Sequence, residues 1–222
     1  MNLKHKILII IFLTLSQFNS AQKKTNLFNG KNLEGWYAFS AEDGKQEDAS
    51  KLFKVEKHLI RFYGNKAGYL MSDQSFGNFK LTVKFRWNTH EAFARKNDKK
   101  NSGVMYLVPQ DTPDMLWPKG YQFQLKEDAT GDFIMLQEVT LVIKGSKTEA
   151  GKSVVATRFA DAEKPYGTWN TLEITHANGT ITQKLNGKLV NEGNDATILK
   201  GRILLQYEGY PIDFRKVAIE RL

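Results

Sequence analysis

Apolar and polar residues alternate along several short stretches of the chain. The clearest run covers residues 78–87. Its apolar positions are Phe79, Leu81, Val83, Phe85 and Trp87, and its polar positions are Lys80, Thr82, Lys84 and Arg86. This pattern predicts a strand with one face in a core and one in water, because strand side chains alternate between faces. No window of a dozen residues has a clear 3.6-residue apolar period. We therefore expect an all-β fold, an antiparallel two-sheet jelly-roll sandwich.

Two Asn-Gly pairs mark tight turns between neighbouring strands. Asn178-Gly179 and Asn186-Gly187 separate strand patterns at 169–176, 180–185 and 188–191. Both central residues of a type I′ turn need a positive φ, which Asn and Gly adopt readily. These patterns therefore predict an antiparallel meander.

Other segments carry weaker patterns. A hairpin is expected over residues 51–64, and two strands over 202–209 and 211–222. The last strand changes parity at Arg215-Lys216, which predicts a bulge. Residues 144–168 have weak periodicity, and we expect them to form a long loop.

We place the working face of the protein in residues 101–132. Within this stretch Tyr121, Phe123 and Leu125 alternate with Gln122, Gln124 and Lys126. One side of this strand can enter the core while the other offers two amides and an ammonium. With Trp117 just before it, that side suits a hydroxyl-rich ligand such as a sugar. An ordinary solvated strand face is the alternative interpretation.

The first residues have the pattern of a secretory signal. Lys4, His5 and Lys6 precede an apolar run over 7–15, and small or polar residues follow as far as Ala21. Such a run is too short to span a bilayer comfortably, so we expect cleavage after residue 21, with no membrane insertion afterwards. A retained single-helix anchor is the alternative. The protein is expected to be periplasmic, extracellular or on the cell surface.

Composition narrows the classes of function. The chain has 222 residues and no cysteine, which excludes disulfides, thiolate catalysis and cysteine-bound zinc. This length suits one domain over residues 22–222. The formal charge is +8, but the basic residues are scattered, so we expect no nucleic-acid partner. The sequence leaves the oligomeric state open.

Several short motifs together resemble the bacterial 3-keto-disaccharide hydrolase domain family, formerly a domain of unknown function. They follow the family's order and cover nearly the whole mature chain: Leu27-Phe28-Asn29-Gly30 with Gly35-Trp36, Asn101-Ser102-Gly103-Val104, Gly120-Tyr121 with Gln124, Gly167-Thr168-Trp169-Asn170, Leu185-Asn186-Gly187, and Leu205-Gln206 with Phe214-Arg215. The resemblance implies a concanavalin A-like lectin/glucanase sandwich, export, and action on sugars.

The chain departs from the family pattern at three positions. The family often has a glutamate where this chain has Gln122, an arginine where it has Leu107, and a histidine where it has Glu208. A neutral amide cannot accept a proton as a carboxylate does. The acid-x-acid-x-x-acid motif of related glucanases is also missing, so we do not expect a retaining glucanase with two carboxylates.

Cleavage of a 3-keto-glycoside needs one tuned base and donors for a developing enolate oxygen. The candidate bases are Glu208 and Glu127. Candidate substrate-binding residues are amides for hydroxyls or the enolate, cations for its charge, and rings for the pyranose face: Asn101, Gln122, Gln124, Gln206, Lys126, Arg215, Trp117 and Tyr106. No metal-ligand spacing is recognisable, so no cofactor is expected, although carboxylates and amides could hold a calcium ion.

The sequence leaves two functions open. The first is an exported glycosidase that acts on disaccharides or 3-keto-glycosides, by abstraction of the C2 proton, elimination and hydration. The second is a carbohydrate-binding module that kept the sandwich and lost the base. Fold alone does not decide between them.

Overall fold

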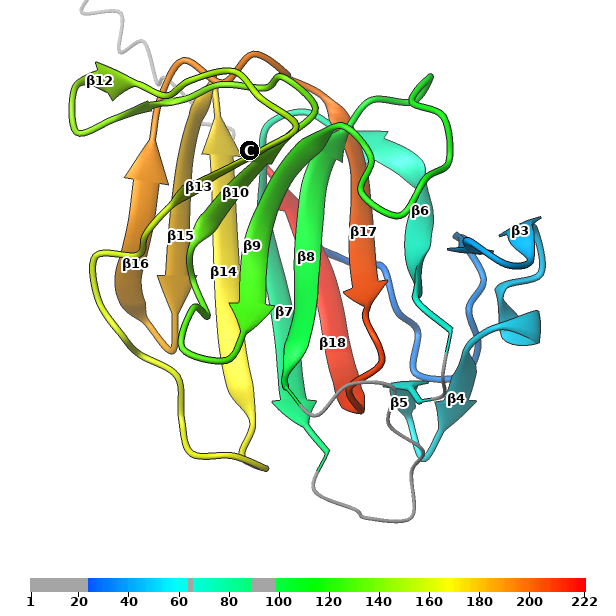
Figure 1. The fold of residues 1–222 in the computed structure, drawn as a ribbon. Coiled ribbons are helices and arrows are strands. Elements are labelled where there is room, and N and C mark those ends of the chain that lie inside the picture. Colours follow the sequence, from blue (N-terminus) through cyan, green and yellow to red (C-terminus); the bar gives the residue numbers. More distant parts are fainter. Residues whose placement is uncertain (1–23, 64–65, 89–98) are drawn as a thin grey trace, which may run out of the picture.

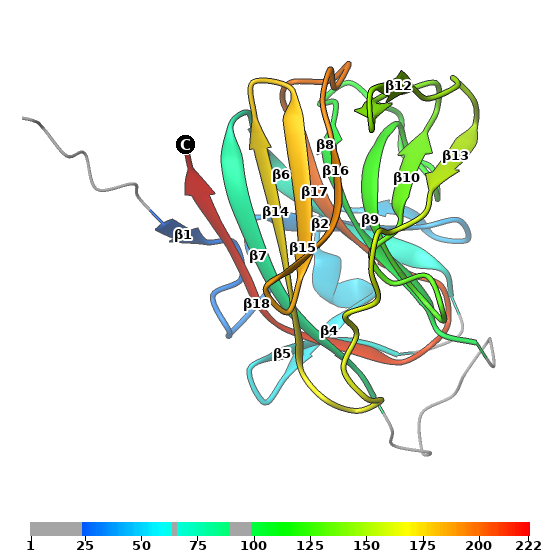
Figure 2. The ribbon, with the colours of Figure 1, turned by 90° about the vertical axis from the view of Figure 1, so that its left-hand side faces the viewer.

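The computed structural model describes residues 24–63, 66–88 and 99–222. Two eight-stranded sheets face each other across one core (Figures 1 and 2). The expected signal at 1–21 lies outside the described residues. Within the described part of the chain, no helix is long and apolar enough to cross a membrane.

The sheet that we call sheet A contains the C-terminal strand at its centre. Its order is β16 (Lys188–Gly193), β15 (Thr180–Leu185), β14 (Asn170–Ala177), β7 (Phe79–Trp87), β18 (Ile212–Arg221), β5 (Leu59–Phe62) and β4 (Lys54–Glu56), with β1 (Lys24–Asn26) paired to β18. Every strand pairing in these ranges is antiparallel.

Sheet B carries the stretch that we predicted to hold the working face. Its order is β13 (Ser153–Ala156), β10 (Phe133–Leu136), β9 (Gly120–Lys126), β8 (Asn101–Val108), β17 (Gly201–Tyr207), β6 (Gly68–Phe76), β2 (Trp36–Ser40) and β3 (Gly44–Gln46). A short 3₁₀ helix, η1 (Ala49–Lys51), and a two-stranded ribbon, β11 (Val142–Ile143) with β12 (Ser146–Lys147), complete the described elements.

Alternation in β7 builds the centre of the core. Its five apolar side chains from Phe79 to Trp87 are at most 1% exposed, while the residues between them are only partly buried. From sheet B, Tyr121, Phe123 and Leu125 enter the same cluster. The two-sheet antiparallel sandwich predicted from the sequence is therefore confirmed.

The turn predictions are also confirmed. Asn178 and Gly179 have φ of 48° and 81°, and Asn186 and Gly187 have 51° and 85°. These values fit the positive φ that a type I′ hairpin requires at both positions. The predicted bulge is present too, as a register shift between Phe214 and Lys216.

The predicted loop over 144–168 is wrong in part, because it contains β12 and β13. Strand β13 pairs with β10 at the edge of sheet B, with Val155 opposite Ile134. Edge pairing depends on backbone hydrogen bonds to a distant segment, so a short strand of four residues leaves little mark in the local apolar pattern. This edge strand forms one side of the candidate functional site.

A bulge near the end of β8 reverses the alternation of inward and outward side chains in that strand. The register with β17 shifts between Arg202 and Leu204, and Leu107 has φ of 55°. As a result Tyr106 and Leu107 both point into the core, whereas Met105 belongs to the apolar cluster on the outer face. The residue that replaces the family's arginine, Leu107, is therefore a core residue.

The bulge requires glycine on the neighbouring strand. A Cβ at Gly201 would lie 2.3 Å from the Leu107 carbonyl carbon and 2.5 Å from the Val108 nitrogen. These backbone atoms cannot move aside without a large cost in free energy. We therefore expect Gly201→Ala to lower the free energy of unfolding by about 2–3 kcal/mol, as overpacked core positions do. Denaturant titration measures this change.

The matched control is Gly77→Ala. A Cβ at Gly77 would find its nearest neighbour, the Leu199 carbonyl oxygen, at 3.7 Å. We expect that variant to stay within about 1 kcal/mol of the wild type. Equal unfolding midpoints for both variants would contradict the assigned role of Gly201.

Candidate functional site

A cavity of about 450 Å³ opens on the outer face of sheet B. This volume lies within the range of small-molecule sites. The cavity lies over β8, β9, β10 and β13 and is bounded by Trp117, from the β8–β9 connection, and by Glu208, just after β17. In Figure 1 that connection is the green loop that extends beyond the end of β8.

The register of sheet B brings the polar residues of the cavity together. Gln122 pairs with Met105, Gln124 with Gly103, and Lys126 with Asn101. Because Tyr207 pairs with Ser102, the next residue, Glu208, comes beside Asn101. The alternation predicted for β9 is confirmed, with its rings and Leu125 in the core and its amides facing the cavity.

Hydrogen bonds join these side chains into one row that ends on Glu208, and we call this set the amide row: Gln122, Gln124, Asn101 and Glu208. Gln122 Nε2 donates to Gln124 Oε1, and Gln124 Nε2 donates to Asn101 Oδ1 at 3.4 Å. Asn101 Nδ2 donates in turn to Glu208 Oε2. Amides can orient a sugar hydroxyl as donors or as acceptors, so the row suits a ligand with several hydroxyls.

Glu208 is the carboxylate of the row and is partly buried. Burial raises the pKa of Glu208, although the Trp117 hydrogen bond and the Lys126 charge act in the opposite direction. Trp117 Nε1 lies 3.4 Å from Glu208 Oε1. A carboxylate whose pKa is raised by burial is better matched to proton abstraction near neutral pH than an exposed one.

Gly103 makes room for the start of the row. A Cβ at this position would lie 2.5 Å from Gln122 Cδ and 2.6 Å from Gln122 Nε2. The Gln122 side chain therefore lies directly over the Gly103 backbone. This contact gives a physical reason for a glycine in the Asn101-Ser102-Gly103 motif.

The family model for the 3-keto-alpha-glucoside-1,2-lyase-like domain matches residues 23–220. The chain belongs to this family. The resemblance predicted from its short motifs is thereby confirmed. No curated protein matches the chain significantly in sequence.

Solved structures with the same fold share little sequence with this lyase-like domain. A crystal structure from Parabacteroides distasonis, named as a candidate glycosyl hydrolase, has a TM-score of 0.63 and 20% identity over 90% of this chain and 94% of its own. A second structure from that organism, similarly named, has a TM-score of 0.60 and 21% identity over 90% and 100%. The carbohydrate binding module CBM66 from Bacillus subtilis has a TM-score of 0.52 and 15% identity over 84% and 95%. At these identities the likeness shows the fold alone.

Six of the ten residues predicted for the site line the cavity: Asn101, Trp117, Gln122, Gln124, Lys126 and Glu208. A seventh, Gln206, lies on the same strand as Leu204 and shares its outward parity, but it is 2% exposed and does not line the cavity. The structure thus gathers most of the predicted polar surface in one place.

The other three predicted residues lie elsewhere in this lyase-like domain. Tyr106 is in the core, where Gln183 of sheet A donates to its hydroxyl at 2.8 Å, so its ring cannot stack on a sugar. Arg215 is exposed on sheet A and lies over the Trp169 ring, 4.1 Å from its centroid. Glu127 is exposed in the turn after β9, outside the cavity lining. These three assignments are corrected.

Sequence reasoning missed the residues that β10 and β13 bring to the cavity. Ile134, Leu136, Ser153 and Val155 line it, together with Gln137 and Lys152 at the ends of these strands. Their position follows from the pairing of β13 with β10 and of β10 with β9. A short apolar run over 133–136 was the one available signal.

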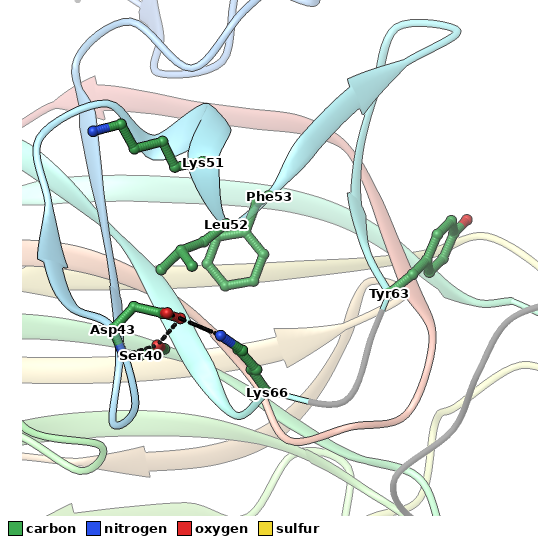
Figure 3. Close-up of a pocket in the computed structure, with 7 residues that line it drawn as sticks. All are labelled: Ser40, Asp43, Lys51, Leu52, Phe53, Tyr63 and Lys66. Atoms are coloured by element: carbon green, nitrogen blue, oxygen red, sulfur yellow. Dashed lines mark hydrogen bonds and ion pairs between the residues drawn. The ribbon is translucent and has the colours of Figure 1, made fainter.

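A second cavity, of about 220 Å³, lies near β2, β3 and η1 (Figure 3). Its polar groups already pair with one another, since Lys66 Nζ lies 2.9 Å from Asp43 Oδ1 and Ser40 Oγ donates to Asp43 Oδ2 at 2.8 Å. Figure 3 shows Lys51 and Tyr63 pointing away from this group. This cavity is smaller and its one carboxylate is already paired with Lys66, so it is the weaker candidate.

Buried polar contacts hold the connection that carries Trp117. Tyr37 and Tyr69 donate from their hydroxyls to Asp114 Oδ1 at 2.7 and 2.6 Å. Arg202, which is 5% exposed, donates to the Tyr37 hydroxyl at 2.9 Å and to the Pro109 carbonyl at 3.1 Å. Burial and the Asp114 hydrogen bond raise the pKa of both tyrosines, which keeps them protonated as donors. Asp114 thus ties the connection to sheet B.

We expect Asp114→Ala to loosen residues 109–119. The variant removes the acceptor of two hydrogen bonds to a charged group, and we expect local opening of this segment to become easier by roughly 2 kcal/mol. Amide hydrogen exchange of the segment measures the change. The control is Asp111→Ala, since Asp111 is exposed in the same connection. Equal exchange in both variants would refute the anchoring role of Asp114.

Proposed function

We propose that this protein is an exported enzyme that cleaves the glycosidic bond of disaccharides or 3-keto-glycosides, with Glu208 as its base. The observation that carries this proposal is the position of Glu208. Its carboxylate has a raised pKa and lies at the end of the amide row in a cavity of about 450 Å³. Family membership supports the same chemistry. The apolar N-terminal segment supports export, and the proposal includes no cofactor.

The reaction follows from the acidity of a hydrogen next to a ketone. With a carbonyl at C3 of the sugar, Glu208 takes the C2 proton and the electron pair forms a C1–C2 double bond. The C1–oxygen bond breaks, and the leaving group departs with a proton. Water then adds across the double bond. Negative charge that develops on the C3 oxygen needs donors nearby, and the amide N–H groups of Gln124 and Asn101 or the Lys126 ammonium can supply them.

A carbohydrate-binding module is the second candidate. Gln122 favours it, because a neutral amide stands where the family often has a carboxylate, and this amide is 4% exposed and bonded to Gln124. In that case the amide row binds the sugar and Glu208 only accepts hydrogen bonds from it. Turnover separates the two candidates.

We expect Glu208→Gln to lower the turnover of a 3-keto-glucoside by about 10²–10⁴-fold, the usual contribution of a general base. Binding should change far less, since an amide keeps the shape and one acceptor. Release of the leaving group and calorimetry measure the two quantities. Glu192→Gln, an exposed change in β16 on the other sheet, is the control. Undiminished turnover by Glu208→Gln would eliminate Glu208 as the base.

The pH dependence of turnover tests the same assignment. A base must be deprotonated, so kcat should rise with pH through a midpoint above the ordinary glutamate pKa of about 4.3. The Lys126 charge lowers the pKa of Glu208, and Lys126→Met should therefore move this midpoint to higher pH. Lys188→Met, in β16 of sheet A, should leave it in place. A midpoint that falls in Lys126→Met would contradict the electrostatic argument.

A further inference from the structure

The cavity on sheet B has two chemically different sides. The amide row covers β8 and β9, whereas β10 and β13 contribute Ile134, Leu136 and Val155. Ile134 pairs directly with Gln122 on one side and with Val155 on the other. The border between polar and apolar lining therefore runs between β9 and β10, along the strands.

The apolar side of the cavity is wide enough to hold a second chemical group beside a sugar. Neighbouring strands lie about 4.8 Å apart, so β8 and β13, three steps apart in sheet B, are separated by roughly 14 Å. A pyranose over β8 and β9 leaves the width of one further ring over β10 and β13. Val155 is 56% exposed on this edge strand, so its side chain is accessible to a bound group.

A second sugar fits this side poorly. Hydroxyls facing Ile134, Leu136 and Val155 would lose hydrogen bonds to water and find no donor or acceptor in exchange. The polar residues of this side, Gln137, Lys152 and Ser153, lie toward the end of β10 where Leu136 pairs with Gly120. Gln137 Nε2 already donates to the Trp117 carbonyl at 3.2 Å.

Trp117 bounds both sides of the cavity. Its indole nitrogen faces Glu208, while its carbonyl accepts from Gln137. An indole surface together with branched aliphatic side chains favours a flat aromatic group, which gains from ring contact and from burial of its edge. A sugar bound on the amide row with its C1 directed toward β10 would place such a group over β10.

We propose that the substrate is an aryl glycoside, with its sugar on the amide row and its aromatic aglycone on Ile134, Leu136 and Val155. This inference rests on the proposed function. The bonds broken and formed are those described above, and the leaving group is a phenol, whose oxygen keeps the electron pair of the C1–oxygen bond and gains a proton.

Binding of three kinds of probe tests the inference: a methyl 3-keto-glucoside and a phenyl 3-keto-glucoside, each as both anomers, and a 3-keto-disaccharide. Calorimetry with Glu208→Gln protein avoids turnover during the measurement. We expect the phenyl probe to bind about tenfold or more tightly than the methyl probe, and more tightly than the disaccharide. Wild-type protein should release phenol from the phenyl probe.

The variant Val155→Asp tests whether the aromatic group binds on the apolar side of the cavity. We expect this variant to remove the preference for the phenyl probe and to leave methyl-probe binding within about twofold. Leu199→Asp is a matched control, because Leu199 is 57% exposed and lies outside the cavity lining. Thermal unfolding of both variants checks that the fold is intact.

The outcomes separate the two proposals. Equal affinity for phenyl and methyl probes, tighter binding of the disaccharide, or a phenyl preference that survives Val155→Asp would overturn the aryl-glycoside inference and leave the proposed function standing. Failure of the wild-type protein to cleave any of the probes would refute the proposed function itself and the inference with it, and binding of the probes without cleavage would favour the carbohydrate-binding module.

Discussion

The register of β9 between β8 and β10 is the constraint on which the rest of the site depends. Side chains alternate with a period of two, so a slip of one residue would send Gln122 and Gln124 into the core and the rings of Tyr121 and Phe123 into water. Those rings are fully buried between the sheets, and their burial makes every other register very costly. The apolar core thus sets the direction of the amides that face the cavity.

The same argument explains how much of the site the sequence could predict. Strict alternation in 121–126 identified the outward amides, and alternation in 202–208 put Glu208 on an outward face. Tyr106 was misplaced because it pairs with Tyr121 and shares that ring's inward face, whereas the β8 bulge, which depends on the close approach of Gly201 from another strand, turns the next residue, Leu107, inward as well. Arg215 lies on the other sheet, and motif order along a chain does not reveal which sheet a strand joins.

Local sequence patterns could not predict the apolar side of the cavity, for a related reason. Ile134 and Val155 are 21 positions apart and become neighbours only through the pairing of β10 with β13. Long-range pairing depends on how all the strands of the sheet are ordered, and the alternation in each strand contains no information about that order. Fold class follows from many strands with turns between them, whereas a site depends on which of these strands are adjacent.

The amide row also has an energetic consequence for binding. Gln122 Oε1 and Gln206 Oε1 are buried and have no hydrogen-bond partner among the described residues, while Gln122, Gln124 and Asn101 each use one of their two amide N–H groups within the row. An unpaired buried carbonyl costs about 1–3 kcal/mol. A hydroxyl that donates to Gln122 Oε1 would recover that energy after a small shift of the side chain. The row is therefore biased toward ligands that place a hydroxyl donor at Gln122, the end of the row opposite Glu208.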